Sequence, residues 1–308
     1  MKIGIIVPFY NGHQWLGRLI ESFGFAARKY ECTLLIIDNS PGNRPVDTAC
    51  RFEMKVKVLR EKPGIGYGKA INRGYDHCKE LGYDCLIVSN QDGYVSDNFI
   101  QEILSPFQQD DKILLTAPLL RMYDSNAVED FFLKYYLSQV PELVSDLIEG
   151  RPRDYYEMNK ISGACFAFNL KSKQYSYPYF FDPLFHMYFE DEDLCHRVQQ
   201  VKGKIVLVPD AVFFHQHANT TDAENRQGIE ADKLVSEKIL RLKNGSKSSV
   251  KVLYGIFVAT ISSFTYHILR GELKKAYLPI RSFAIILYKL PAILKTRRQD
   301  ILCSKTIG

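Results

Sequence analysis

The chain has 308 residues, of which 46% are hydrophobic and 24% charged, so it can bury one large core or two modest ones. Its seven cysteines are an odd number without a CxxC pair, which disfavours a disulfide framework or a zinc site and favours thiols in a reducing cytosol. The net charge of +5 conceals an asymmetry, because residues 233–308 carry 15 Lys and Arg against 3 Asp and Glu and the remainder is acidic. No long apolar stretch follows a basic start at the N-terminus, so we expect no signal peptide.

The first half of the chain has the pattern of strands alternating with helices. Residues 2–11 and 32–40 are short apolar runs that end in turn residues, which indicates strands. Residues 13–30 lie between them and place their large apolar side chains on one helical face. Such alternation predicts an α/β fold with a mostly parallel sheet covered by helices on both faces. The further elements expected here are strands at 56–59, 83–92 and 112–120 and helices at 66–81 and 96–107, the last capped by Ser96 or Asp97.

The second half is less regular at first and then returns to the same pattern. Residues 121–160 are rich in Tyr, Phe and acids, and a strand is expected at 161–170. A helix at 191–201 and a strand, turn and strand at 204–217 follow. Polar residues from Thr221 to Lys233 mark the best boundary. Because ligands bind beyond the carboxyl ends of parallel strands, the polar strand ends "PFYN", "DNS" and "NQD" should converge on one site.

Four consecutive acids, Glu190 to Asp193, directly follow the aromatic run "FHMYF". Acids in a first helical turn favour the helix dipole, which accounts for Glu192 and Asp193. It does not account for Glu190 and Asp191, which stand against the aromatic residues. A carboxylate in such surroundings has a raised pKa and can serve as a general base.

Other candidate residues carry weaker signals. Asp92 ends the strand "VSNQD", where a carboxylate suits Mg²⁺ or Mn²⁺ but is also common in ordinary turns. His215 and His217 end the strand "AVFFHQH", and at most one of them is expected to face the site as a metal or phosphate ligand. The glycine loop "GIGYGK" has Lys69 where a dinucleotide motif needs its third glycine, which leaves a tight turn or a phosphate or sugar contact.

Taken in order, these motifs resemble glycosyltransferase family 2, whose members are inverting enzymes of the GT-A fold. The resemblance covers about residues 2–220 and is strongest to bacterial rhamnosyltransferase-like members. It implies a Rossmann-like GT-A catalytic domain over residues 1–232, with a sugar-donor half at about 1–118 and an acceptor half at about 119–232. Residues 233–308 then form a basic amphipathic helical tail.

The resemblance also assigns roles to individual residues. Asp191 corresponds by position to the catalytic base, with Glu190 supporting it. "NQD" resembles the DxD metal motif with Asn90 in place of the first acid, so Asp92 is expected to bind Mg²⁺ or Mn²⁺ together with His215. "GIGYGKAINRG" resembles N-x-G-x-x-x-A-x-N-x-G, with Gly64 in place of the first Asn. The expected contacts to the sugar donor are Pro8, Tyr10, Asn11, Asp38 (to the base), Asn39, Gly66, Asn72, Asn90, Gln91 and Asp92.

The implied function is transfer of a sugar from a nucleotide-diphosphate donor to a saccharide or lipid-linked acceptor in bacterial surface polysaccharide synthesis. The resemblance favours dTDP-rhamnose as the donor, with a UDP-hexose as its rival. A nucleotidyltransferase is disfavoured, because "PFYNGHQW" lacks a Gly-rich loop with Arg or Lys after the first strand. The altered "NQD" leaves open an inactive polysaccharide-binding or scaffold module.

The tail favours a membrane surface over nucleic acid. Residues 252–269 contain no formally charged side chain and are close to the minimum length for a membrane span. Residues 273–298 mix apolar side chains with Lys and Arg, which is typical of helices in a membrane interface. The basic residues alternate with aliphatic ones and form no polar stripe for nucleic acid. We therefore expect a cytoplasmic enzyme bound peripherally to the anionic inner face of the cytoplasmic membrane, in preference to intramolecular packing of the tail or a true span.

Overall fold

The computed structural model describes residues 1–42, 44–216, 226–245 and 247–306, so His217 lies outside the described residues. The strands are β1 (Lys2–Phe9), β2 (Glu31–Asp38), β3 (Lys55–Arg60), β4 (Cys85–Ser89), β5 (Gly93–Val95), β6 (Ile113–Met122), β7 (Tyr156–Glu157), β8 (Cys165–Asn169) and β9 (Lys204–His215). The helices are α1 (His13–Ala27), α2 (Tyr67–Glu80), α3 (Phe99–Leu104), α4 (Pro106–Gln109), α5 (Asp130–Tyr135), the 3-10 helix η1 (Leu137–Gln139), α6 (Pro141–Ile148), α7 (Glu190–Gln200), α8 (Arg226–Lys243), α9 (Ser249–Leu269) and α10 (Leu273–Thr306).

The strands form one nine-stranded sheet in the order β3-β2-β1-β4-β8-β6-β9-β5, with β7 also paired to β9. The pairs β1–β2, β2–β3, β1–β4 and β6–β9 are parallel, whereas β8 runs antiparallel to both β4 and β6. Strands β5 and β7 are antiparallel to β9. The prediction of a mostly parallel sheet is therefore confirmed, and the carboxyl ends of β1, β2, β4 and β9 lie at the same edge.

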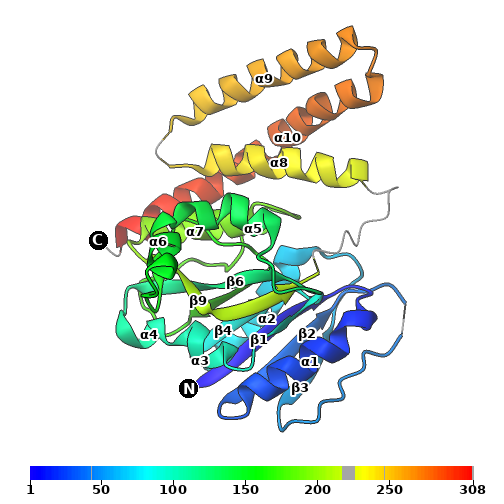
Figure 1. Cartoon of the computed structure of the whole chain (residues 1–308). Helices are drawn as coiled ribbons and strands as arrows, with labels where there is room; N and C mark the ends of the chain where they lie inside the picture. The colour runs from blue at the N-terminus through cyan, green and yellow to red at the C-terminus, as the bar shows by residue number, and fades with distance from the viewer. Residues whose placement is uncertain (43, 217–225, 246, 307–308) are drawn as a thin grey trace.

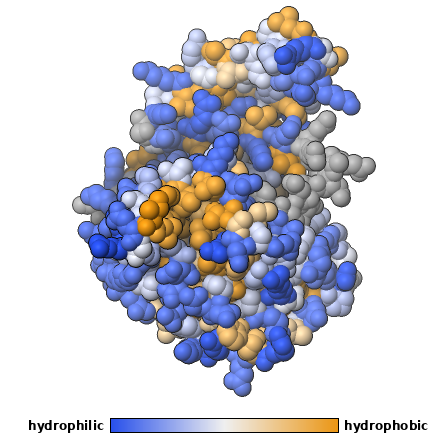
Figure 2. All heavy atoms as spheres, in the orientation of Figure 1, coloured by the Kyte–Doolittle hydropathy of each residue, from blue (hydrophilic) through white to orange (hydrophobic). Residues whose placement is uncertain are grey.

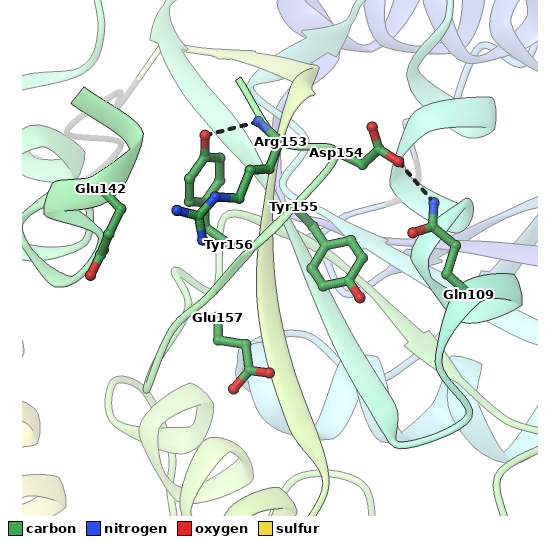
Figure 3. Close-up of a pocket in the computed structure, with 7 residues that line it drawn as sticks. All are labelled: Gln109, Glu142, Arg153, Asp154, Tyr155, Tyr156 and Glu157. Carbon is green, nitrogen blue, oxygen red and sulfur yellow. Dashed lines mark hydrogen bonds between the residues drawn. The ribbon is translucent and has the colours of Figure 1, made fainter. Parts of the chain in front are cut away.

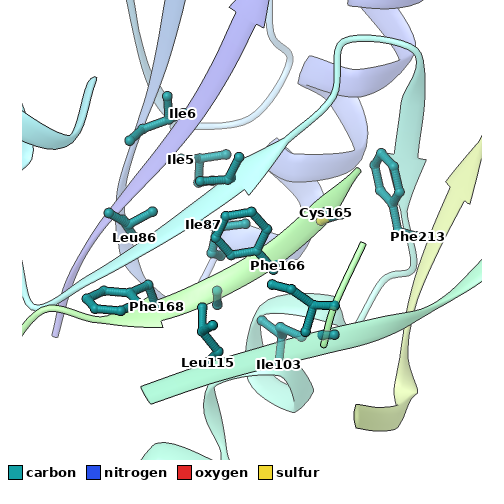
Figure 4. Close-up of a cluster of buried hydrophobic side chains, with 14 of the residues drawn as sticks. Ile5, Ile6, Leu86, Ile87, Ile103, Leu115, Cys165, Phe166, Phe168 and Phe213 are labelled. Carbon is teal, nitrogen blue, oxygen red and sulfur yellow. The ribbon is translucent and has the colours of Figure 1, made fainter. Parts of the chain in front are cut away.

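Helices cover both faces of this sheet (Figure 1). Helices α1 and α3 lie together, and the rings of Phe23 and Phe99 meet edge to face at 5.9 Å. Helix α2 packs against the other side of β1 so closely that a Cβ on Gly74 would come within 2.7 Å of Ile6. Between these layers the strands contribute a continuous aliphatic and aromatic core (Figure 4). This core fixes the strand ends that carry the polar residues.

Several element boundaries differ from the sequence prediction. The helix expected from Ser96 begins at Phe99 and is followed by the separate short helix α4, because Pro106 starts a new turn. Residues 204–215 form one strand, and a register shift against β6 after Pro118 replaces the expected turn. Helix α7 begins at Glu190, one residue before the expected start, so all four acids lie in its first turn.

The helical tail is joined to the sheet domain by its own apolar cluster. The expected boundary between residues 232 and 233 falls inside α8. Figure 1 shows α9 farthest from the sheet, while α10 runs back from α9 toward the sheet domain. The buried members of the tail cluster are Phe185, Ile239, Leu240, Leu242, Val252, Ile256, Ile286 and Ile293. The tail therefore packs on the segment that precedes the acidic helix.

The outer part of the tail exposes apolar side chains, some of which are visible among hydrophilic ones in Figure 2. In α9 the residues Val252, Ile256 and Thr260 point inward, whereas Val258 and Ile261 are 46% and 45% exposed. Within the described residues, the segments 249–269 and 273–305 are long and apolar enough to cross a membrane by length and composition alone. A second exposed apolar group lies on α6 of the sheet domain and consists of Val144, Leu147 and Ile148.

Candidate active site

The side chain of Gln91, the residue before Asp92, holds the loop after β1 through two hydrogen bonds. The Gln91 side chain accepts a hydrogen bond from the Tyr10 N–H at 2.8 Å and donates one to the Tyr10 carbonyl at 3.1 Å. Gly12 faces the same side chain, and a Cβ there would approach it to 2.4 Å. Asn11 has a left-handed backbone with φ of 52°, and its N–H donates to Ser40 Oγ at 2.9 Å. Tyr10 remains half exposed beside Pro8, so this loop offers an aromatic face to a ligand.

Asp38 lies buried at the end of β2 and is paired with Arg60 at the end of β3. Its other carboxylate oxygen accepts the Ser40 N–H at 3.0 Å. The neighbouring Asn39 donates both its N–H and its side-chain amide to the Phe9 carbonyl, each at 3.0 Å. The β1 and β2 ends are thus locked together. Arg60 is a charged residue of this region that the sequence analysis missed.

The glycine loop is shaped by His186 and by the segment before the acids. Gly66 has φ of 88°, and a Cβ there would meet the His186 carbonyl oxygen at 2.8 Å and its Nδ1 at 2.9 Å. Glycine is therefore required on both conformational and steric grounds. The Asn72 amide donates to the Phe181 carbonyl and accepts the Phe181 N–H, each at 2.7 Å. Asn72 thus ties α2 to the loop that leads to the acids.

His215 stands between two carboxylates at the end of β9. Its Nε2 is 3.5 Å from Asp92 Oδ1 and 3.3 Å from Asn90 Nδ2, and its Nδ1 is 3.5 Å from Glu129 Oε2. Burial alone would lower the pKa of His215, but the carboxylates of Asp92 and Glu129 outweigh burial and raise it to about 9. Glu129 is buried at the start of α5, and the sequence analysis missed it.

The chemistry of Asp92 and His215 fits a divalent cation. Carboxylate oxygens and imidazole nitrogens are both ligands that such a cation accepts, and Asp92 Oδ1 lies 3.5 Å from His215 Nε2. A carboxylate on the opposite ring nitrogen, as Glu129 supplies, is the usual partner of a metal-binding histidine. Among the described residues no group of three His, Cys, Asp or Glu side chains could hold a metal by itself. Further ligands would have to come from a bound phosphate and water.

The acidic helix holds its first two carboxylates in different environments. Asp191 accepts hydrogen bonds from the N–H groups of Gly163 and Glu192, each at 2.9 Å. Burial raises the pKa of Asp191 to about 6, against the effect of these hydrogen bonds. Glu190 is 6% exposed, and in the described part of the chain its Oε2 has no hydrogen-bond partner. Burial and the Asp191 charge raise the pKa of Glu190, so this pair of carboxyls keeps a proton to a higher pH than a solvent-exposed acid would.

Tyr67 and the turn before β8 connect two acidic groups, namely Asp92 with Glu129 and Glu190 with Asp191. The Tyr67 hydroxyl donates to the Gly163 carbonyl at 2.5 Å, and the Asn90 N–H donates to the Ala164 carbonyl at 2.7 Å. Burial raises the pKa of Tyr67 well above its usual value, with further contributions from the charges of Glu190, Asp191 and Asp92. The Tyr67 hydroxyl therefore lies within electrostatic reach of both groups. The sequence analysis missed Tyr67 and Gly163.

The sequence profile of Glycosyl transferase family 2 matches residues 4–170, which is more than half of the chain. The chain belongs to this family. Over 244 residues it is 22% identical to the N-acetylglucosaminyl-diphospho-decaprenol L-rhamnosyltransferase of Mycobacterium tuberculosis, and the match spans 70% of this chain and 76% of that protein. The prediction that the chain is a glycosyltransferase is confirmed.

Two solved structures show the same fold. GalNAc-T7, solved with UDP, GalNAc and Mn²⁺, has a TM-score of 0.53 and 15% identity over 78% of this chain, which spans only 47% of that longer protein. The mannosyltransferase PcManGT from Pyrobaculum calidifontis, in complex with GDP-Man and Mn²⁺, has a TM-score of 0.53 and 12% identity, and the match covers 99% of this chain and 86% of that one. The GT-A fold of the transferase is thereby confirmed. The roles of all individual site residues stay predictions, and Asp191 and His215 also lie beyond residue 170, where the family profile ends.

The transferase has a cavity of about 560 Å³, which Figure 3 shows with its lining residues. It is lined by Gln109, Glu142, Arg153, Asp154, Tyr155, Tyr156 and Glu157. Gln109 precedes β6, and Glu157 pairs with Val206 near the start of β9. The cavity is therefore at the amino-terminal edge of these strands, opposite His215, and takes no part in the candidate active site.

Proposed function

We propose that this family 2 transferase moves a sugar, with inversion, from a nucleotide-diphosphate donor to a saccharide or lipid-linked acceptor. The observation that carries this proposal is the buried pair of carboxyls at the start of α7, where Asp191 accepts two backbone N–H bonds and burial raises the pKa values of Asp191 and Glu190. A base whose pKa lies close to the working pH is effective in proton transfer. A group that can stabilise a leaving diphosphate completes the requirements for glycosyl transfer.

In the proposed reaction Asp191 takes the proton from the acceptor hydroxyl while that oxygen bonds to the anomeric carbon. The bond from the anomeric carbon to the diphosphate oxygen breaks on the opposite side, and the nucleoside diphosphate leaves with the electron pair. Glu190 stays neutral, so that the base has no second negative charge beside it. A divalent cation held by Asp92 and His215 would neutralise charge on the departing diphosphate.

The proposed nucleotide pocket lies at the ends of β1, β2 and β4. Tyr10 supplies an exposed aromatic surface for the nucleobase of the donor, and Asp38 lies beneath the adjoining loop. Gly66 keeps the glycine loop free of a side chain. The other proposed contacts are Pro8, Asn11, Asn39, Asn72, Asn90 and Gln91. We retain a sugar-donor half over about residues 1–118 and an acceptor half over about 119–232.

The identity of the substrates rests on more distant support. The Mycobacterium tuberculosis relative is named for L-rhamnosyl transfer and for an N-acetylglucosamine carried on diphospho-decaprenol. By that analogy we propose dTDP-rhamnose as the sugar donor and a lipid-linked saccharide of a surface polysaccharide, such as O-antigen, capsule or cell wall, as the acceptor. A UDP-hexose is the alternative donor. The exposed apolar side chains of α6 are in the proposed acceptor half and would suit a lipid-bearing acceptor.

We further propose that the outer tail attaches the enzyme to the anionic inner face of the cytoplasmic membrane. The exposed apolar residues of α9 and the excess of Lys and Arg over residues 233–308 support this placement. Both features are typical of helices that lie in a membrane interface. The catalytic domain would then remain on the side where nucleotide sugars are made.

The proposal can be tested by incubating the protein with dTDP-rhamnose, UDP-glucose, UDP-galactose and GDP-mannose, with and without Mn²⁺. The expected result is release of a nucleoside diphosphate from one donor. The same donor should raise the melting temperature of the protein. The Asp191→Asn variant should keep the thermal shift and lose the release. Binding without turnover of any donor by the wild type, even with acceptor extracts added, would favour the inactive binding module instead.

A further inference from the structure

The segment between Asp182 and Phe189, which leads into the acidic helix, is held by the tail. Ser236 of α8 donates a hydrogen bond from its hydroxyl to the Met187 carbonyl at 2.8 Å. Lys289 of α10 donates to the Leu184 carbonyl at 3.2 Å. Phe185 is one of the buried residues of the tail cluster, and Leu184 and Phe189 pack against it. The segment that leads into Glu190 therefore contacts helices that lie far away in the sequence.

A buried ion cluster extends this connection to the acidic helix itself. Lys243 Nζ, at the end of α8, lies 2.5 Å from Asp182, 2.7 Å from Asp193 and 3.1 Å from Asp300. These side chains are at most 4% exposed. Asp193 also accepts a hydrogen bond from Arg197 at 2.9 Å. One lysine thus joins the loop, helix α7 two residues after Asp191, and the far end of α10.

The backbone that leads into the acids is strained. Tyr188 and Phe189 both adopt left-handed conformations, with φ of 67° and 65°. Bulky residues pay an energetic penalty in this region and keep the conformation only where the surroundings enforce it. The surroundings here are the tail contacts to Met187, Leu184 and Phe189. Without them the segment would relax, and the first turn of α7 would lose its present direction.

We infer that helices α8 and α10 position the carboxyl groups of Glu190 and Asp191. The positioning residues are Ser236, Lys243 and Asp300. This inference rests on the proposed role of Asp191 as the base. It makes the tail part of the machinery that aligns the reaction, in addition to any attachment to a membrane. Ending the chain near Lys247 would remove Lys289 and Asp300, so it should abolish transfer to soluble acceptors as well as any membrane binding.

The test compares Asp300→Asn and Ser236→Ala with a matched control. Asp300→Asn keeps the shape of the side chain, removes one charge beside Lys243 and changes the group that accepts the Tyr179 hydroxyl. Ser236→Ala removes the hydroxyl that donates to the Met187 carbonyl. Glu237→Gln is the control, because Glu237 is 47% exposed on the same helix and, within the part of the chain that the structure describes, forms an ion pair with Arg241 alone, at 3.8 Å. Turnover is measured with the donor of highest activity among dTDP-rhamnose, UDP-glucose and UDP-galactose, together with its KM and the pH profile of kcat.

We expect each test variant to lower kcat by about 10- to 100-fold, because small displacements of a reacting group are costly in rate. The donor KM should change by less than about two-fold, and the acidic limb of the kcat profile should shift, while Glu237→Gln matches the wild type. A purely structural effect would reduce the folded fraction and scale the rate equally at every pH. That result, or wild-type kcat per folded molecule in both variants, would overturn the inference. Asp191→Asn is assayed in parallel: its retained activity would refute the proposed function itself, whatever the tail variants do.

Discussion

Exposed side chains of α9 can test membrane attachment without disturbing the fold. Val258 and Ile261 are three residues apart, neighbours on the helix surface, and both are nearly half exposed. The buried face of the same helix, at Val252, Ile256 and Thr260, is untouched by changing them. The double variant Val258→Ser, Ile261→Ser therefore removes apolar surface of which the protein leaves nearly half exposed. Shortening the chain would be a poorer test, since it breaks the Lys243–Asp300 pair.

The expected loss follows from the exposed fractions. Fully burying a Val or Ile side chain is worth about 1.5–3 kcal/mol. With 46% and 45% of the two side chains available for burial in lipid, each contributes about 1 kcal/mol. The double variant should therefore lose about 2 kcal/mol, which corresponds to roughly 30-fold weaker partitioning onto vesicles.

The assay is co-flotation with anionic vesicles over a series of lipid concentrations and at two salt concentrations. Salt should weaken binding of the wild type without abolishing it, because only the charged part is screened. Leu81→Ser is the control, since it removes an apolar side chain that is 51% exposed but lies at the end of α2. Equal flotation of the double variant and the wild type would refute interfacial attachment through α9. Resistance of the wild type to both high salt and alkaline carbonate would instead indicate a true span.

Three further predictions concern the active site. Asp191→Asn should lower kcat by ~10²–10⁴-fold with donor binding retained in thermal-shift assays, and near-normal turnover would exclude this base. Wild-type kcat should fall about tenfold per pH unit below about pH 6, because protonation removes the base, and a flat profile down to pH 5 would contradict this. Asp92→Ala should abolish the response of activity to Mn²⁺. Glu129→Gln should weaken Mn²⁺ affinity by about 10- to 100-fold in titration calorimetry with the nucleotide present. Unchanged activity in excess chelator would show that no metal is needed.

The sheet could be predicted because its strands can be recognised from their local sequence. β1, β2 and β4 are continuous apolar runs that end in polar residues, and such runs need no information from the rest of the chain. The acids of α7 were also conspicuous, since four carboxylates next to aromatic residues have no simple packing explanation. The starting point of that helix was not predictable, because it depends on the left-handed conformations of Tyr188 and Phe189.

The remaining parts of the site depend on contacts between distant residues. Tyr67 and Gly163 are 96 positions apart, and neither has a local pattern that marks it. Glu129 meets His215 only because β6 and β9 lie side by side, and Arg60 reaches Asp38 only because β3 pairs with β2. The tail shows the same limit. Its periodicity indicated an apolar face, but periodicity alone does not distinguish the side that packs on α8 from the side that is exposed.

Helix α10 fixes a spacing that has consequences for the acceptor. It contains 34 residues, which corresponds to roughly 50 Å along its path, and both Pro279 and Pro291 lie within it. One end adjoins α9, and the other carries Asp300 in the ion cluster beside the acidic helix. If α9 rests on a bilayer, this helix sets the height of Asp191 above the membrane surface. A carrier lipid would then present its sugar to Asp191 only when the glycan is long enough to span that height, so acceptor length would be selected by geometry as well as by chemical recognition.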